Sequence, residues 1–196
     1  FSKHKINLIG SGRTDTGVHA KHQVANIALD THLSCENIKN AINSKIGNDV
    51  RINSCEIINS DFNSRFSAVS REYIYIISSE KSPIKRKYYW MIEEDFNFNL
   101  LKDCAKAVIG IHDFSLFCKE KSLKENNECK ITCSKWIREK NRYSYTIIGN
   151  RFLHHMVRFL VGTMIEVGKS RITFEDFCNL LKNKKIPNII MKAPAS

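Results

Sequence analysis

Apolar and polar positions follow one another along this chain in short blocks, and their spacing switches between that of strands and that of helices. Every second residue over 23–29 belongs to one face, which is typical of a half-buried strand. Apolar residues over 38–46 instead recur at helical spacing, behind a capping residue at Ser34 and ahead of Gly47, where a helix can end. The first third of the chain therefore predicts, in order, a buried strand over 6–9, a strand over 23–29, a helix over 35–46 and a strand over 50–58.

The rest of the chain repeats this interleaving. The pattern there predicts a strand over 71–79, a helix over 100–108 that stops at Gly110, and strands over 136–139 and 143–148 that turn at Lys140. A long helix is predicted over 152–167. A shorter helix is predicted from Thr173, where Asp176 completes a capping box. Because strands and helices interleave in two similar blocks, we expect an α+β fold with two ferredoxin-like halves that share a mixed, mostly antiparallel sheet.

Two segments lack any hydrophobic period. The polar stretch over 59–64 marks the expected boundary between an N-terminal subdomain, residues 1–64, and a C-terminal subdomain, residues 65–196. The charged stretch over 119–128 is expected to be a mobile surface loop.

The charge balance is strongly basic. Among 196 residues, 31 Lys and Arg against 20 Asp and Glu give a formal charge of +11, which favours a polyanionic partner. Charge alone does not separate RNA from DNA or from an anionic membrane surface. Since no apolar run reaches transmembrane length and no signal segment is evident, we expect a cytoplasmic protein that binds no membrane.

The cysteine and histidine content does not favour a metal centre or a disulfide scaffold. Seven cysteines, an odd number without dense spacing, are typical of reduced thiols. A Cys-x3-Cys pair at Cys129 and Cys133 is a weak metal signal, even with Cys118, and His154 and His155 would point about 100° apart on a helix. We therefore expect no metal ion.

The stretch over 82–90 mixes cations with aromatic rings, ending in Tyr88, Tyr89 and Trp90. Such a mixture can grip an RNA backbone and stack on its bases. A solvated loop with its aromatic rings turned inward explains the pattern equally well.

Over residues 10–20 the sequence reads Gly-Ser-Gly-Arg-Thr-Asp-Thr-Gly-Val-His-Ala, between the first two expected strands. It places Asp15 beside Arg13 in a turn whose glycines let a substrate approach the backbone. A P-loop is excluded because no lysine follows the last glycine, and a dinucleotide fingerprint is excluded because Asp15 stands where its third glycine should be. Alternatively, Asp15 merely caps its own turn.

On the long helix expected over 152–167, the helical period groups three basic side chains. Arg151, His154 and Arg158 fall on one flank, beside an apolar stripe that faces the core. The flank is either a solvated helix edge or the wall of a polar site.

The string over 10–20 closely resembles the signature loop of the TruA family of tRNA pseudouridine synthases. Two further motifs follow in the family's order, Arg-Phe-Ser-Ala at 65–68 with Arg-Glu-Tyr-Ile-Tyr at 71–75, and Asn-Arg-Phe-Leu-His-His-Met-Val-Arg at 150–158. His-Asp-Phe-Ser at 112–115 and Ala-Pro-Ala at 193–195 match weaker landmarks, so the resemblance spans nearly the whole chain.

The resemblance implies the pseudouridine synthase fold, with helices on one side of the sheet and a central active-site cleft. It implies catalytic roles for Asp15, Tyr73 and Arg158, and RNA binding or base flipping for Arg13, Arg65, Arg71, His154 and Arg151. Asp15 would be the nucleophile, Arg158 would pair with it across the cleft, and Tyr73 would stack on a flipped uridine. The implied partners are the anticodon stem-loop of tRNA and a second copy of the chain, with no cofactor.

The resemblance also leaves questions open. Attack at C1′ of the ribose and at C6 of the uracil are both compatible with Asp15. A noncatalytic RNA-binding or remodelling protein on the same fold is the alternative function, and a phosphoryl-transfer enzyme lacks both the lysine and a metal-binding acid. The family's opening strand and helix and its last strand have no counterpart here, so we expect a fragment that is poorly stable by itself.

Overall fold

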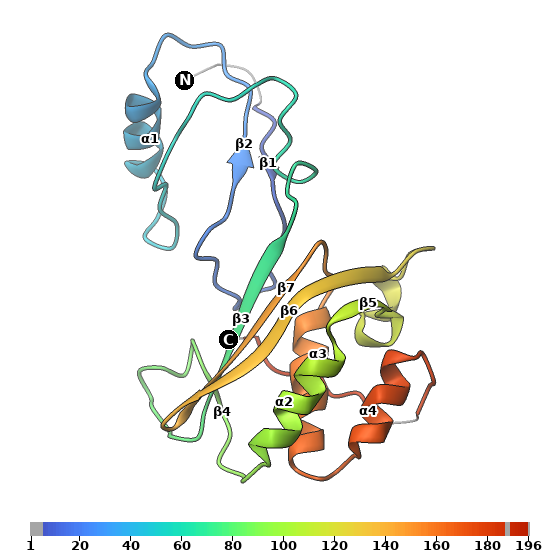
Figure 1. The fold of residues 1–196 in the computed structure, drawn as a ribbon. Coiled ribbons are helices and arrows are strands. Elements are labelled where there is room, and N and C mark those ends of the chain that lie inside the picture. Colours follow the sequence, from blue (N-terminus) through green and yellow to red (C-terminus); the bar gives the residue numbers. More distant parts are fainter. Residues whose placement is uncertain (1–5, 187–188, 196) are drawn as a thin grey trace. The chain divides into compact units, whose positions relative to one another are not determined.

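The computed structural model describes residues 6–186 and 189–195, which its contacts divide into two units (Figure 1). The smaller unit takes residues up to 13 and 21–68, and the larger takes 14–20 and the residues from 69 onward. The segment that carries Asp15 therefore belongs to the larger unit, whereas Arg13 belongs to the smaller one. The division into subdomains after residue 64 stays a prediction.

The smaller unit contains a two-stranded antiparallel sheet and one helix. Strand β1 (Ile9–Gly10) pairs with β2 (Ala25–Asn26), and Ser64 ties itself to both, its Oγ donating to Ile9 O at 2.7 Å and its N–H to Asn26 Oδ1 at 2.9 Å. Helix α1 (Cys35–Asn43) follows Ser34, whose side chain accepts from Asn37 N as expected of a cap.

Three expectations for this unit are wrong. The strands over 6–9 and 23–29 shrink to two residues each, and Leu8 is exposed rather than buried. No strand forms over 50–58, where the Asn43 side chain both accepts from Ile52 N and donates to Ile52 O. Apolar alternation makes a strand only where a neighbouring strand takes up its backbone hydrogen bonds, and here the Asn43 side chain takes up those of Ile52 instead.

The larger unit is built on a five-stranded sheet in the order β4-β3-β7-β6-β5. Its strands are β3 (Arg71–Ser78), β4 (Trp90–Met91), β5 (Gly110–Asp113), β6 (Glu128–Glu139) and β7 (Arg142–Gly149). Only the pair of β3 with β4 is parallel in this sheet, so the expected α+β class with a mixed, mostly antiparallel sheet is confirmed. The expected hairpin is present, with Lys140 at φ +53° in its turn.

Helices cover one face of this sheet. Burial alternates strictly along β7, and its buried residues Tyr143, Tyr145 and Ile147 join the core. Helices α2 (Phe98–Ala107), α3 (Met156–Gly168) and α4 (Phe174–Leu181) pack together over that core (Figure 1). Two short 3-10 turns, η1 (Ser115–Phe117) and η2 (Glu120–Ser122), link β5 to β6. Within the described ranges, no helix has both the length and the apolar character that crossing a bilayer requires.

The start of α3 differs from the expectation. The helix begins at Met156, four residues after the predicted start at Phe152, because His155 has a left-handed backbone with φ of +66°. A non-glycine residue in that region cannot continue a right-handed helix. Residues 151–155 therefore form an irregular approach to the helix, and side chains in it do not follow the helical period. By contrast, α4 begins as predicted, with the capping box of Thr173 and Asp176.

Candidate functional site

Asp15 lies at the start of a tight turn in the larger unit. Val18 N donates to Asp15 O at 3.0 Å, and Gly17 has a φ of +86°, which favours glycine. A side chain at this glycine would also meet Ala195 Cβ at 3.3 Å. The turn thus positions Asp15 against the C-terminal segment of the same unit.

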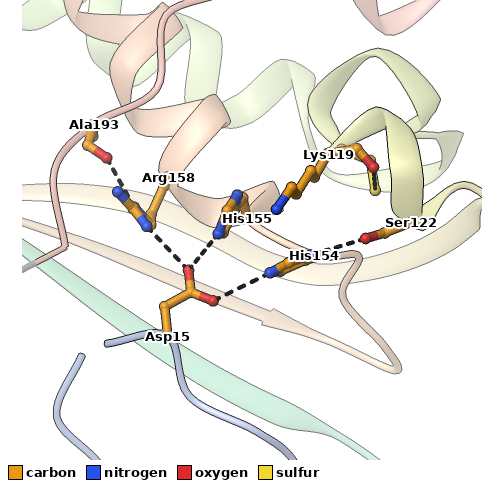
Figure 2. Close-up of polar contacts among 8 residues, drawn as sticks. Asp15, Lys119, Ser122, His154, His155, Arg158 and Ala193 are labelled. Carbon is orange, nitrogen blue, oxygen red and sulfur yellow. Dashed lines mark hydrogen bonds and ion pairs between the residues drawn. The ribbon is translucent and has the colours of Figure 1, made fainter. Parts of the chain in front are cut away.

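Three side chains from the start of α3 surround the Asp15 carboxylate (Figure 2). Arg158 Nη1 lies 3.1 Å from Oδ2, and His155 Nε2 also lies 3.1 Å from Oδ2. His154 Nε2 lies 3.5 Å from Oδ1. The structure therefore brings together Asp15, Arg158 and His154, as the sequence motifs suggested, and adds His155.

The position of Asp15 at the N-terminus of α3 is electrostatically favourable. The first turn of a helix carries partial positive charge on its free N–H groups, and a carboxylate there is stabilised by about 0.3–1 kcal/mol. Arg158, the third residue of α3, adds a full positive charge to the same end. The carboxylate of Asp15 offsets both, so acid and helix end stabilise each other.

Arg158 is anchored on two sides. Its Nε donates to Ala193 O at 2.9 Å while its Nη1 donates to Asp15, and Ala193 N donates back to Arg158 O at 3.0 Å. Tyr75 holds the same segment, because its hydroxyl donates to Pro194 O at 2.8 Å. The Ala-Pro landmark thus orients the guanidinium that contacts Asp15.

The C-terminal segment packs directly on the backbone of α3 at Gly162. A Cβ at this position would overlap Met191 O and lie 2.8 Å from Ala193 N, both backbone atoms that cannot rotate away. Gly162→Ala is therefore expected to lower the free energy of unfolding by about 1–3 kcal/mol, measured by chemical denaturation. The matched control is Gly47→Ala, where nothing lies within 4 Å and where the change should stay within about 0.5 kcal/mol. Equal effects at the two glycines would contradict the packing described here.

His155 is the residue of this cluster that the sequence patterns missed. Its side chain is 12% exposed, and burial lowers the pKa of its ring below the ordinary value, with the Asp15 carboxylate opposing that effect. The helical period expected over 152–167 places His155 on a helix, away from the flank of Arg158. A signal was available: histidine tolerates the left-handed backbone better than most residues, and two histidines stand directly before the apolar run.

His154 is held in place by residues of the charged stretch over 119–128, which follows η1. Its Nδ1 lies 2.9 Å from Ser122 Oγ (Figure 2), and its backbone O accepts from Lys119 N at 3.1 Å. The rings of His154 and His155 lie 4.0 Å apart, centre to centre. The stretch over 119–128, expected as a surface loop, therefore contains η2 and supports one wall of the Asp15 site.

Tyr73 lies on β3 within electrostatic reach of Asp15. Its ring packs edge-on against Phe152 at 4.9 Å between centroids. Burial raises the pKa of the Tyr73 hydroxyl, the Arg71 guanidinium opposes this, and the Asp15 carboxylate adds to it. Arg71 itself donates to Asn150 O at 3.0 Å, so it braces the segment that leads to the two histidines.

Arg151, Arg13 and Arg65 are the remaining candidate residues. Arg151 does not share a flank with His154 and Arg158, because it precedes the helix, and it donates to Asn126 O at 3.2 Å instead. That prediction from helical spacing is wrong. Arg13 and Arg65 belong to the smaller unit and are exposed, and Arg65 lies over the Phe66 ring at 5.5 Å.

Asp15, His154 and His155 also have the ligand types of a metal site, with donor atoms all within 4.8 Å of one another. The geometric reason given above against metal binding by the two histidines is wrong, because they precede the helix rather than lying on it. The Arg158 guanidinium, already on Oδ2, disfavours a cation at the same oxygen. Among the described residues, Cys118, Cys129 and Cys133 join no such cluster. The absence of a metal ion stays a prediction.

Comparison with known proteins finds one family throughout. The profile of a family described as tRNA pseudouridine synthase matches residues 104–196. The tRNA pseudouridine synthase A of Chlorobium limicola is 37% identical over 176 residues, which cover 90% of this chain and 72% of the relative. That of Dictyoglomus thermophilum is 37% identical over 195 residues, covering 97% and 79%. A tRNA pseudouridine synthase A 2 of Bacillus cereus is 34% identical over 194 residues, covering 98% and 79%.

Proposed function

Because the chain belongs to the tRNA pseudouridine synthase family, we propose that Asp15 is the nucleophile with which this enzyme isomerises uridine to pseudouridine in the anticodon stem-loop of tRNA. The observation that carries the proposal is the Asp15 carboxylate at the N-terminus of α3, in contact with Arg158 at 3.1 Å. A protein that only binds RNA has no use for a part-buried acid, which repels phosphate.

The reaction needs one nucleophile and proton transfers, but no cofactor. The bond from uracil N1 to ribose C1′ breaks, a bond from C5 to C1′ forms, C5 loses its proton and N1 gains one, so nothing is oxidised or reduced. Asp15 adds to C1′ or to C6 and leaves again at the end. Arg158 keeps the carboxylate oriented between the two events, through its second contact with Ala193 O.

Tyr73 stacks on the flipped uracil in this proposal. Since burial raises the pKa of its hydroxyl, Tyr73 stays a neutral phenol at physiological pH and acts as a hydrogen-bond donor or relay rather than as a free base. Arg65, Arg71, Arg151 and His154 contribute further contacts to the RNA. The charge of +11 supplies the long-range attraction to tRNA. We further propose that the enzyme acts as a homodimer in the cytoplasm.

Arg13 is the proposed base-flipping residue, and its loss has a distinctive expected result. A uridine paired in a stem must be extruded, whereas one in an unstructured oligonucleotide is already free. Arg13→Ala is expected to slow conversion of the stem uridine at least about tenfold and that of the free uridine less than about threefold. Single-turnover assays on the two substrates measure this. Arg51→Ala, which removes an exposed charge from the same unit, is the control, and equal losses on both substrates for Arg13→Ala would rule out the flipping role.

The direct test of the proposed function is incubation with unmodified tRNA transcript, followed by chemical mapping of pseudouridine. We expect modification in the anticodon stem-loop, unchanged by a chelator. A noncatalytic RNA-binding protein would bind the transcript and leave every uridine unmodified. Loss of activity with chelator, restored by zinc, would contradict the metal-free mechanism and point to Asp15, His154 and His155 as ligands.

A further inference from the structure

We propose that His155 is a positioning residue whose Nε2–H fixes Oδ2 of Asp15, so that Oδ1 is the oxygen that attacks the substrate. The inference rests on the proposed function, because it assigns roles to the two oxygens of the same nucleophile. It concerns a residue for which neither the sequence motifs nor the comparisons assign a role.

The two oxygens of Asp15 have different surroundings. Oδ2 has both the Arg158 guanidinium and the His155 ring at 3.1 Å, each within hydrogen-bond distance. Oδ1 has His154 Nε2 at 3.5 Å, longer than the roughly 2.7–3.2 Å of an ordinary N–H···O bond. An oxygen that accepts a hydrogen bond from a guanidinium and faces a second ring nitrogen at 3.1 Å is a poorer nucleophile than one without such close partners. The attacking oxygen is therefore Oδ1, and the donors on Oδ2 hold it in place.

The protonation state of His155 follows from its surroundings. Burial lowers the pKa of the ring, and His154, Lys192 and Arg158 act in the same direction, against the Asp15 carboxylate. The ring is therefore neutral at physiological pH and carries one proton. Because a carboxylate only accepts hydrogen bonds, the atom that faces Asp15 must bear this proton. His155 is thus the Nε2–H tautomer, a neutral donor that adds no further positive charge beside the nucleophile.

The backbone at His155 directs the ring toward Asp15. Its φ of +66° at the N-cap of α3 interrupts the helix there, and the ring lies between His154, at 4.0 Å, and Phe159, at 6.3 Å between centroids. A left-handed backbone at a non-glycine residue is costly and is retained where surrounding contacts enforce it. His155 therefore has two separate roles: its backbone makes the turn before α3, and its ring donates to Asp15. Substitutions can remove one role and keep the other.

Two substitutions make the separation. Asparagine tolerates the left-handed backbone well, but its amide nitrogen stands near the place of Nδ1 and falls short of Asp15. Glutamine tolerates that backbone less well, but its amide nitrogen reaches the place of Nε2. If the ring donates to Asp15, His155→Gln retains activity and His155→Asn loses it. If His155 serves only the backbone turn, the order is reversed.

The experiment measures single-turnover rate at saturating tRNA, the dissociation constant for tRNA and the melting temperature of both variants. We expect His155→Asn to slow the reaction about 10- to 100-fold, the range for a catalytic group displaced by about 1 Å, with unchanged tRNA affinity. His155→Gln should stay within about threefold of wild type. A His155→Asn variant as fast as His155→Gln, or a loss of rate that follows the melting temperature, would overturn the proposal.

A second measurement is independent of turnover. Nitrogen-15 NMR of the wild-type protein distinguishes the two neutral tautomers of an imidazole from its charged form. We expect His155 at neutral pH to be neutral with its proton on Nε2, and the Nδ1–H tautomer or an imidazolium would overturn the proposal. A wild-type protein that leaves tRNA unmodified would contradict the proposed function instead, and the NMR result would still decide the state of His155.

Discussion

Asp15→Asn is expected to reduce pseudouridine formation by a factor on the order of 10⁴ or more, as removal of a covalent nucleophile does in other enzymes. The amide has nearly the shape of the carboxylate and still accepts a hydrogen bond from Arg158, but it cannot add to carbon and leave again. Affinity for tRNA should change less than about threefold, since phosphate contacts dominate binding. A single-turnover assay and a filter-binding titration measure the two quantities.

The control for this variant is Asp95→Asn, which removes an exposed carboxylate from the same unit. It should leave both rate and affinity near those of wild type. An Asp15→Asn variant with near-normal turnover would show that the nucleophile lies elsewhere. A variant that lost rate and tRNA affinity together would instead indicate that Asp15 supports the fold or the RNA contact.

Arg158→Met is expected to have the second-largest effect. The change removes the guanidinium hydrogen bond to Asp15 Oδ2 and the link to Ala193 O, so the carboxylate loses its charged partner and much of its orientation. We expect the single-turnover rate to fall at least about a hundredfold, the cost of a misplaced catalytic group. Stability should fall by about 2 kcal/mol, less than the 3–5 kcal/mol of a fully buried broken pair, because the Arg158 and Asp15 side chains retain 16% and 22% exposure.

Arg158→Lys separates charge from geometry. Lysine keeps the positive charge but cannot span Asp15 and Ala193 with one planar group, so an intermediate rate is expected. Arg171→Met is the matched control, since it removes an arginine that pairs with Glu94 and Glu166 away from Asp15. If Arg158→Met kept the rate of Arg171→Met, the Asp15–Arg158 pair would be structural only.

The spacing of apolar residues predicted the helices and strands of the larger unit well, because there the apolar side chains predicted to be buried do pack against a neighbouring element. Each apolar stripe of β3, α2 and β7 meets a neighbour that buries it, and local signals such as the Thr173 cap need no partner from elsewhere. Strands were wrongly predicted in the smaller unit because Val50 and Ile57 carry an apolar pattern but remain exposed, and no strand among the described residues lies beside them. The hydrophobic pattern of a segment shows which side chains could be buried, and tertiary contacts determine whether they are buried.

Only the residues of the candidate site that lie in a recognisable sequence motif could be predicted. Asp15 and Arg158 were found as residue types in recognisable strings, and their contact joins positions 143 residues apart in the chain. His155 was missed because its role depends on a left-handed backbone that no hydrophobic period reveals. The Ser122 contact with His154 was hidden in a stretch without any pattern. These contacts are tertiary, and sequence period carries no information about them.

In the proposed reaction, the ribose moves from N1 to C5 of a tRNA uridine at the Asp15 site, and C5 loses its proton. Release of tritium from transcript labelled at C5 of uridine measures this step directly, because the label leaves as water only when the new bond to C5 has formed and the proton is lost. Wild-type protein should release one tritium for each pseudouridine mapped in the anticodon stem-loop, and Asp15→Asn should release none above background. Failure of the wild-type protein to release tritium, or equal release by Asp15→Asn, would rule out Asp15 as the nucleophile of a pseudouridine synthase reaction.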